Sequence, residues 1–116
     1  MNRFEAEVRA RGMTVFAHID HAAGAAAAGL SLRPTELLIF GNARSSTSLM
    51  ESVQTLGIDL PLKALVWQDA SGSAFLSYND PAFLVRRHGL DGANSPTVDA
   101  MAAALKAMAS KATTPS

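Results

Sequence analysis

The residues best suited to chemistry lie in one short stretch, residues 18–21, which reads HIDH. Imidazole and carboxylate groups can coordinate a metal ion or transfer protons near neutral pH. On a strand, His18 and Asp20 point to the same face, and His21 enters the following loop or helix. A metal site usually needs three or four protein ligands, so Glu36 or His88 would also have to come close. This is the functional hypothesis for the stretch.

The same stretch has a structural interpretation, which we favour, so no metal site is predicted. Asp20 is a good N-cap for a helix that begins at His21. His21, near that helix start, would bond a neighbouring backbone group. His18, on an apolar strand, would be a core histidine with its hydrogen bonds satisfied.

A second set of polar residues follows the most apolar strand of the sequence. Gly41 and Asn42 tolerate positive φ, and the Asn42 amide lies where α/β sheets often bind ligands. The serines and threonine at 45–48, before a helix, resemble an anion site, but no phosphate-loop or dinucleotide motif is present and Arg44 is the nearby cation. Turn and capping chemistry is the interpretation that we favour for these residues. Tyr78 can direct its hydroxyl into a cleft beside Asn42, or bond a backbone carbonyl.

The candidate ligand-binding residues are therefore Asp20, His21, Gly41, Asn42 and Tyr78. No complete catalytic motif is present, because the serines lack the G-x-S-x-G pattern of a nucleophile elbow. The sequence names neither catalytic residues nor a cofactor. These candidate residues are compatible with a small-molecule ligand.

Periodicity and turn residues predict the elements that position these side chains. Strands are predicted at 13–19, 36–40, 62–68 and 73–78. Helices are predicted at 3–11, 20–28, 48–56, 81–88 and 96–111. Within the third helix, Ser48 and Glu51 form a potential capping box. Residues 69–72 fit a hairpin turn between the last two strands, which should be antiparallel.

These elements predict a single compact α+β domain with a mixed sheet of about four strands and helices packed on it. The unbroken apolar run from Leu37 to Phe40 favours a strand covered on both faces. The strand, helix and strand over 13–41 predict a βαβ unit with a right-handed parallel crossover. Residues 62–78 form a C-terminal hairpin. The domain would span 1–90, and 91–116 would hold a linker, an amphipathic helix and a frayed tail.

Composition narrows the function classes. Ten basic and ten acidic residues cancel in this chain of 116, so no net field attracts nucleic acid or an anionic membrane. The absence of cysteine excludes disulfides, thiolate zinc sites and cysteine nucleophiles. The amino terminus is charged, and no apolar run is long enough to cross a bilayer. We expect a cytoplasmic protein with no nucleic-acid or membrane partner.

Three strings together resemble one bacterial and archaeal family, domain of unknown function 302: GMTVFAHIDHAAGAAAAGLSLRPTELLIFGN, TSLMESVQTLGIDLPLKALVWQD and SYNDPAFLVRRHGL. They cover roughly residues 10–90. The resemblance implies a small α+β domain with a mixed sheet, often a homodimer, and no agreed activity. Two features depart from the family pattern: Ala43 replaces a usual proline, and the usual strand before the first helix is missing, which would leave a sheet edge open.

Two functional hypotheses follow. The first is a homodimeric, non-catalytic binding or interaction module, with the open sheet edge or the C-terminal helix in the contact. The second is an enzyme that binds a small molecule or a metal near Asp20, His21, Asn42 and Tyr78. They differ in whether those four side chains converge on one pocket.

Overall fold

The computed structural model describes residues 1–90 and 95–114. It is a single α+β domain, as predicted. The strands are β1 (Thr14–Asp20), β2 (Thr35–Gly41), β3 (Leu62–Gln68) and β4 (Ala74–Tyr78). The helices are α1 (Asn2–Ala10), α2 (His21–Ala27), α3 (Ala43–Ser52), the short 3₁₀ helix η1 (Gln54–Ile58), α4 (Pro81–Arg87) and α5 (Pro96–Thr113). Residues 91–94 of the expected linker and 115–116 of the expected tail lie outside the described residues.

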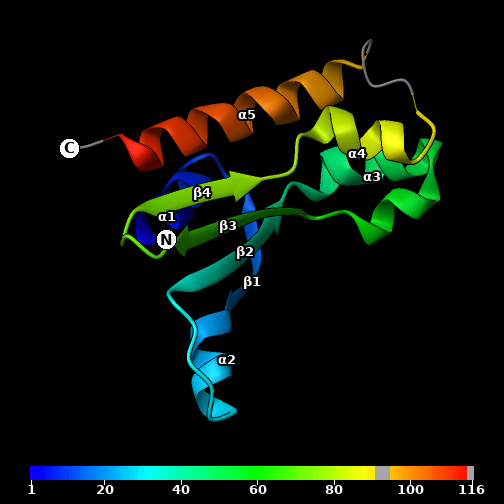
Figure 1. Cartoon of the computed structure of the whole chain (residues 1–116). Helices are drawn as coiled ribbons and strands as arrows, with labels where there is room; N and C mark the ends of the chain where they lie inside the picture. Colours follow the sequence, from blue (N-terminus) through cyan, green and yellow to red (C-terminus); the bar gives the residue numbers. More distant parts are fainter. Residues whose placement is uncertain (91–94, 115–116) are drawn as a thin grey trace.

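The four strands form one sheet in the order β1-β2-β3-β4, and every neighbouring pair is antiparallel (Figure 1). The predicted parallel crossover over 13–41 is therefore wrong, and the sheet is antiparallel instead of mixed. A parallel connection would have to carry the chain back along the whole length of β1 before β2 could begin. The seven-residue helix α2 instead stays at the far end of β1, and Asp20 pairs with Glu36. The sequence pattern of a strand, a helix and a strand does not show whether the second strand runs parallel or antiparallel to the first.

The helices cover one face of the sheet. Alternate residues of the two central strands are at most 4% exposed, namely Leu38, Phe40, Leu62 and Ala64. Their neighbours Leu37, Ile39 and Leu65 are only half-buried. The expectation that residues 36–40 are covered on both faces is wrong, because an apolar run on an antiparallel strand can also belong to a face that no element of the same chain covers.

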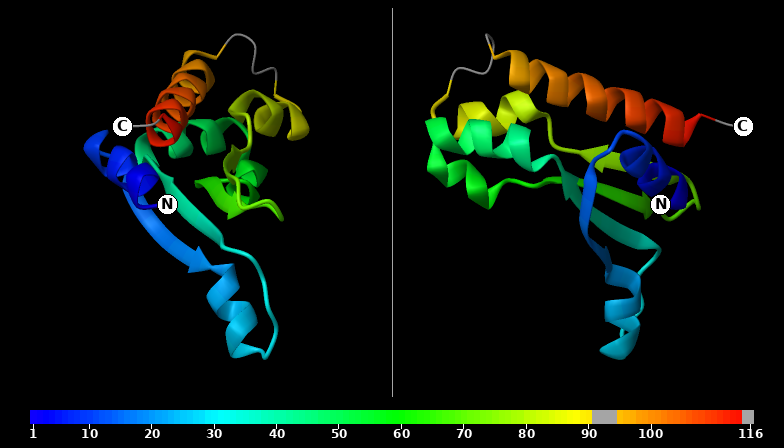
Figure 2. Two further views of the ribbon diagram at one scale, coloured as in Figure 1. Left: turned by 60° about the vertical axis from the view of Figure 1, so that its left-hand side comes forward. Right: turned by 180° about the vertical axis from the view of Figure 1, so that it is seen from behind.

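The core lies between this covered face and the helices α1 and α5, which pack side by side (Figure 2). Phe4 of α1 and Phe40 of β2 meet edge to face, with ring centroids 5.3 Å apart and planes at 73°. The predicted apolar stripe of α5 is buried in the same core: Val98, Met101, Leu105 and Met108. Within this chain α5 thus folds back over its own sheet.

The helix caps follow the sequence at three places and differ at one. Asp20, Asp80 and Ser95 each accept a hydrogen bond from the first turn of the following helix, as their residue types suggest. Helix α3, however, begins at Ala43 instead of near Ser48, because Asn42 Oδ1 accepts from the backbone N–H groups of Arg44 and Ser45. The capping box predicted at Ser48 therefore lies inside the helix.

Residues 21–34, here called the arm, extend away from the rest of the domain (Figures 1 and 2). Helix α2 has no buried residue. The leucines that follow it are strongly exposed, Leu30 at 68% and Leu32 at 50%. An isolated helix of seven residues is marginal in water, so the caps at its two ends account for much of its order.

Candidate functional site

The residues predicted to bind a ligand do not meet in one place. Asp20 pairs with Glu36 at the start of β2, whereas Gly41 pairs with Thr14 at the start of β1. These two positions on β2 are five residues apart in sequence, which corresponds to about 16 Å along a strand. His21 lies with Asp20 at one end of the sheet, and Asn42 lies with Gly41 at the other.

Tyr78 is separate from both pairs. It is the last residue of the edge strand β4, where it pairs with Ala64 and is 38% exposed. Asn42 borders a cavity of about 140 Å³ together with Ser45 and Ser46, and Tyr78 does not line this cavity. The side-chain oxygen of Asn42 is engaged in the cap of α3. Hence the hydroxyl of Tyr78 and the amide of Asn42 do not share a cleft.

The two histidines of the 18–21 stretch have different surroundings. His18 is not a core residue, since its side chain is 34% exposed and lies between two carboxylates. Its Nε2 is 2.7 Å from Glu36 Oε1, and its Nδ1 is 3.5 Å from Glu5 Oε1. His21 is exposed, and within residues 1–90 and 95–114 its side chain makes no hydrogen bond, so the expected bond to the backbone is missing.

Of the two residues that could join the 18–21 stretch, Glu36 does come close to His18, whereas His88 contacts Asp59 and Thr55 instead. The approach of Glu5 was not predicted, because it lies on a separate element, α1. The two carboxylates contact opposite nitrogens of the imidazole ring, so they do not converge on a shared point. Among the described residues, no group of three His, Cys, Asp or Glu side chains is arranged to hold a metal ion. This cluster of His18, Glu5 and Glu36 links β1 to β2 through the hydrogen bond between His18 and Glu36, and β1 to α1 through the longer contact between His18 and Glu5.

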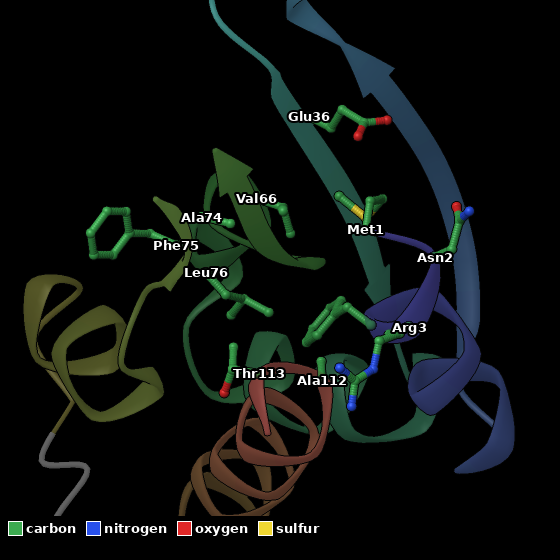
Figure 3. A pocket seen from close by; sticks show the side chains of 11 residues that line it. Met1, Asn2, Arg3, Glu36, Val66, Ala74, Phe75, Leu76, Ala112 and Thr113 are labelled. Carbon is green, nitrogen blue, oxygen red and sulfur yellow. The ribbon is translucent and has the colours of Figure 1, made fainter. Parts of the chain in front are cut away.

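A cavity of about 480 Å³ opens beside Glu36, within the size range of small-molecule pockets. It lies between the inner face of the sheet, the start of α1 and the end of α5 (Figure 3). Its apolar walls come from Met1, Phe4, Val66, Ala74, Leu76 and Ala112, and its polar groups from Asn2, Arg3, Glu36 and Thr113. Phe75 also borders the cavity, but its ring points away from it (Figure 3). We call this the α1–α5 cavity.

The strand register divides the α1–α5 cavity into two halves. One row across the inner face holds Asp20, Glu36, Val66 and Leu76, of which the last three line the cavity. The β1–β2 half of this row is acidic, and the β3–β4 half is apolar. Arg3, on the helix side, donates from Nη2 to the backbone carbonyls of Lys111 and Thr114, which ties the two ends of the chain together.

A second histidine cluster lies at the opposite end of the domain. His88 Nε2 is 2.6 Å from Asp59 Oδ2, and His88 Nδ1 is 2.9 Å from Thr55 Oγ1. The side chains of His88 and Asp59 are only 11% and 15% exposed. Carboxylate, imidazole and hydroxyl in a row resemble a nucleophilic triad in composition, but here they join η1 to the last turn of α4. We assign this cluster a structural role.

The uncovered face of the sheet is the largest feature that the sequence did not predict. Its outward positions hold six large apolar side chains, which we call the outer face: Ile19, Leu37, Ile39, Leu65, Trp67 and Phe75. Trp67 and Phe75 stack with ring centroids 4.8 Å apart, and Trp67 Nε1 donates to Ser77 Oγ. Lys63 is the single charged side chain at the outward positions that the strand pairings define.

Comparisons with known proteins agree with this fold. The model of a family described as domain of unknown function DUF302 matches residues 1–110, which includes most of α5. A crystal structure of an uncharacterized conserved DUF302 protein from Bacillus stearothermophilus superposes with a TM-score of 0.83 at 20% identity, covering 96% of this chain and 86% of the other. At that identity the likeness concerns the fold.

Curated relatives carry a functional name. "Fluoride-specific ion channel FluC 1" of Brucella suis biovar 1 (strain 1330) and its namesake of Brucella abortus biovar 1 (strain 9-941) are each 48% identical to this chain over 101 residues. The match covers 87% of this chain, but the chain spans only 40% and 37% of the length of these relatives. Within the described residues, no helix is both long enough and apolar enough to cross a membrane.

Proposed function

The chain belongs to the DUF302 family of unknown function, and from this premise we propose that it is a homodimeric, non-catalytic interaction module that pairs through the outer face of its sheet. The observation that carries the proposal is the set of six large apolar side chains on a face that no helix of the described residues covers. Ile19 is 39% exposed and Phe75 is 44% exposed. Contiguous apolar surface of this kind marks interaction sites.

The chemistry of the outer face favours a second copy of the same chain as the partner. In a twofold dimer the same patch meets itself, so a charged patch would place like charges opposite each other. Lys63 is the one charged group at the paired outward positions, and it lies toward the α3 end of the sheet. A polyanion would find little to bind there, in keeping with equal numbers of acidic and basic residues.

The outer face alone is smaller than a standard dimer interface. Three inter-strand spacings and about six residues of strand give a face of about 15 by 20 Å. A standard interface buries about 800 Å² on each partner, so this face needs an additional contact. The arm supplies one, because it continues from β1 and β2 and exposes Leu30 and Leu32.

A matched pair of substitutions tests the proposal. Ile19→Lys places a charge on the outer face, whereas Ile58→Lys makes the same change at a site on η1 that is 77% exposed. By light scattering at about 100 μM, where even a modest interface associates, we expect the parent and Ile58→Lys at twice the 12.1 kDa of one chain, and Ile19→Lys at 12.1 kDa. A monomeric parent, or equal behaviour of the two variants, would contradict the proposal.

The relatives named as fluoride channels favour a second candidate function, that of a domain serving a fluoride channel. Identity of 48% over 101 residues links this chain to one segment of those proteins. The experiment compares fluoride efflux from vesicles that contain the Brucella suis relative with efflux through the same protein lacking its matched segment. A changed rate or fluoride dependence would support this role, and unchanged efflux would argue against it.

The enzyme hypothesis has no comparable support. It requires Asp20, His21, Asn42 and Tyr78 to surround one pocket, and the strand register keeps them at separate positions on the sheet. Our proposal for this chain is therefore not built on those four residues.

A further inference from the structure

We propose that the α1–α5 cavity binds a small organic amine, with its ammonium group at Glu36 and a short apolar body against Val66 and Leu76. This site is separate from the outer face, because Glu36, Val66 and Leu76 occupy the inward positions of β2, β3 and β4. The inference is independent of the dimer. It rests on the shape, charge and free hydrogen-bonding capacity of the cavity.

The polar half of the cavity is suited to a cation. Glu36 uses Oε1 for His18, while Oε2 accepts no hydrogen bond from the described residues. Its side chain is 31% exposed, so an incoming ligand can reach it without unfolding the sheet. Asp20 occupies the same row but does not line the cavity, so Glu36 is the carboxylate that an incoming cation would meet.

The positive groups near the cavity are directed elsewhere. Arg3 donates to the backbone carbonyls at the end of α5, and its guanidinium lies beside Ala112, across the cavity from the Glu36 carboxylate (Figure 3). Arg9 is paired with Glu5 at 3.4 Å, outside the cavity lining. Met1 also lines the cavity, but among the described residues no lysine, arginine or amino-terminal group forms an ion pair with Glu36. An ammonium can therefore approach Oε2, while His18 occupies Oε1.

The rest of the cavity selects against a purely polar ligand. Val66 and Leu76 form the floor on the β3–β4 side, and Ala112 of α5 lies across from them (Figure 3). Phe4 of α1 adds a further apolar side chain to the lining. Burying alkyl groups on such walls is favourable, whereas an inorganic cation would leave the walls wet. A ligand with one ammonium group and an alkyl chain of about six carbons can place its charge at Glu36 and its chain against the apolar walls.

Hexylamine is a suitable probe, with 1-hexanol and hexanoate as matched controls of equal length. For a ligand of this size we expect a Kd of about 1 mM for hexylamine, measured on the full chain from amide chemical shifts. Shifted amides should cluster at Leu76 and Thr113. Hexanol should bind at least about fivefold more weakly, and hexanoate should not bind, because Glu36 repels it.

Substitutions then assign the head-group contact. Glu36→Gln should weaken hexylamine about tenfold, because the charged acceptor is lost, and Glu51→Gln, the same change at an exposed position on α3, should have no effect. Val66→Thr should weaken binding about threefold by wetting the apolar wall. A dispersed amide spectrum of each variant verifies that it is folded.

Three outcomes would overturn the proposal. The first is no amide shift around the cavity at about 10 mM hexylamine, ten times the expected Kd. The second is equal binding of hexylamine, hexanol and hexanoate, which would reveal a non-selective apolar surface. The third is a Glu36→Gln variant that binds hexylamine as the parent does.

Discussion

Replacing Phe40 by alanine tests the central packing of the domain. Phe40 has no exposed surface and meets Phe4 edge to face. Truncating a buried phenylalanine costs about 3 to 5 kcal/mol, because apolar burial is lost and a cavity remains. The aromatic pair is worth a further 0.5 to 1.5 kcal/mol or so, which places the expected loss near the upper end, at about 4 to 5 kcal/mol. That is a large part of the stability of a domain of this size.

The assay is urea unfolding followed by the fluorescence of Trp67, the only tryptophan, at one fixed protein concentration. With a slope of about 2 kcal/mol per molar urea, the midpoint should fall by about 2 M. Phe83→Ala is the matched control, because Phe83 is 51% exposed on α4, and its midpoint should move by less than about 0.5 M. A shift for Phe40→Ala as small as that of the control would refute the placement of Phe40 in the core.

Three further predictions concern polar contacts. Asn42→Ala should cost about 1 kcal/mol in urea unfolding because α3 loses its cap, and Asn42→Asp should restore the lost stability; equal losses in both variants would contradict the capping role. His88→Ala should cost about 1 to 3 kcal/mol, since it leaves Asp59 without its shortest hydrogen bond; Asp59→Asn should lose less, and an unchanged midpoint for His88→Ala would be inconsistent with the link. The Ser71 hydroxyl, which donates to Asp69, lowers the pKa of that carboxyl from its ordinary value, so the turn should keep its order above the ordinary pKa of aspartate and lose it as the pH falls through the lowered pKa. An NMR titration of the Ser71 amide with a midpoint at or above that ordinary pKa would contradict this.

The local elements were predictable because their signals are local. Pro81 and Pro96 begin α4 and α5 one residue after capping side chains, and Gly72 has the positive φ that the β3–β4 turn requires. The apolar stripe of α5 also predicted which of its side chains are buried. Each of these features depends on residues within about one helical turn or one hairpin of one another.

The direction of β2 and the covering of the sheet were not predictable in the same way. Leu37 and Leu38 have the same residue type, yet one faces the outer surface and the other the core. Only the arrangement of the helices decides between them, and that arrangement depends on contacts between distant elements. The α1–α5 cavity was missed for the same reason, since Arg3, Glu36 and Thr113 are far apart along the chain.

The meander order of the sheet has a consequence for how the chain folds. Each strand pairs with its neighbour in sequence, so every sheet pairing closes a loop much shorter than the one between α1 and α5, and it costs less entropy. The contact of α1 with α5 is different, since Arg3 and Lys111 are 108 residues apart. We expect the strands to associate early and α5 to dock last, so that mutations in α5 mainly accelerate unfolding while mutations in the β2–β3 pair slow folding. The helix that completes the core would then also be the first element to leave it.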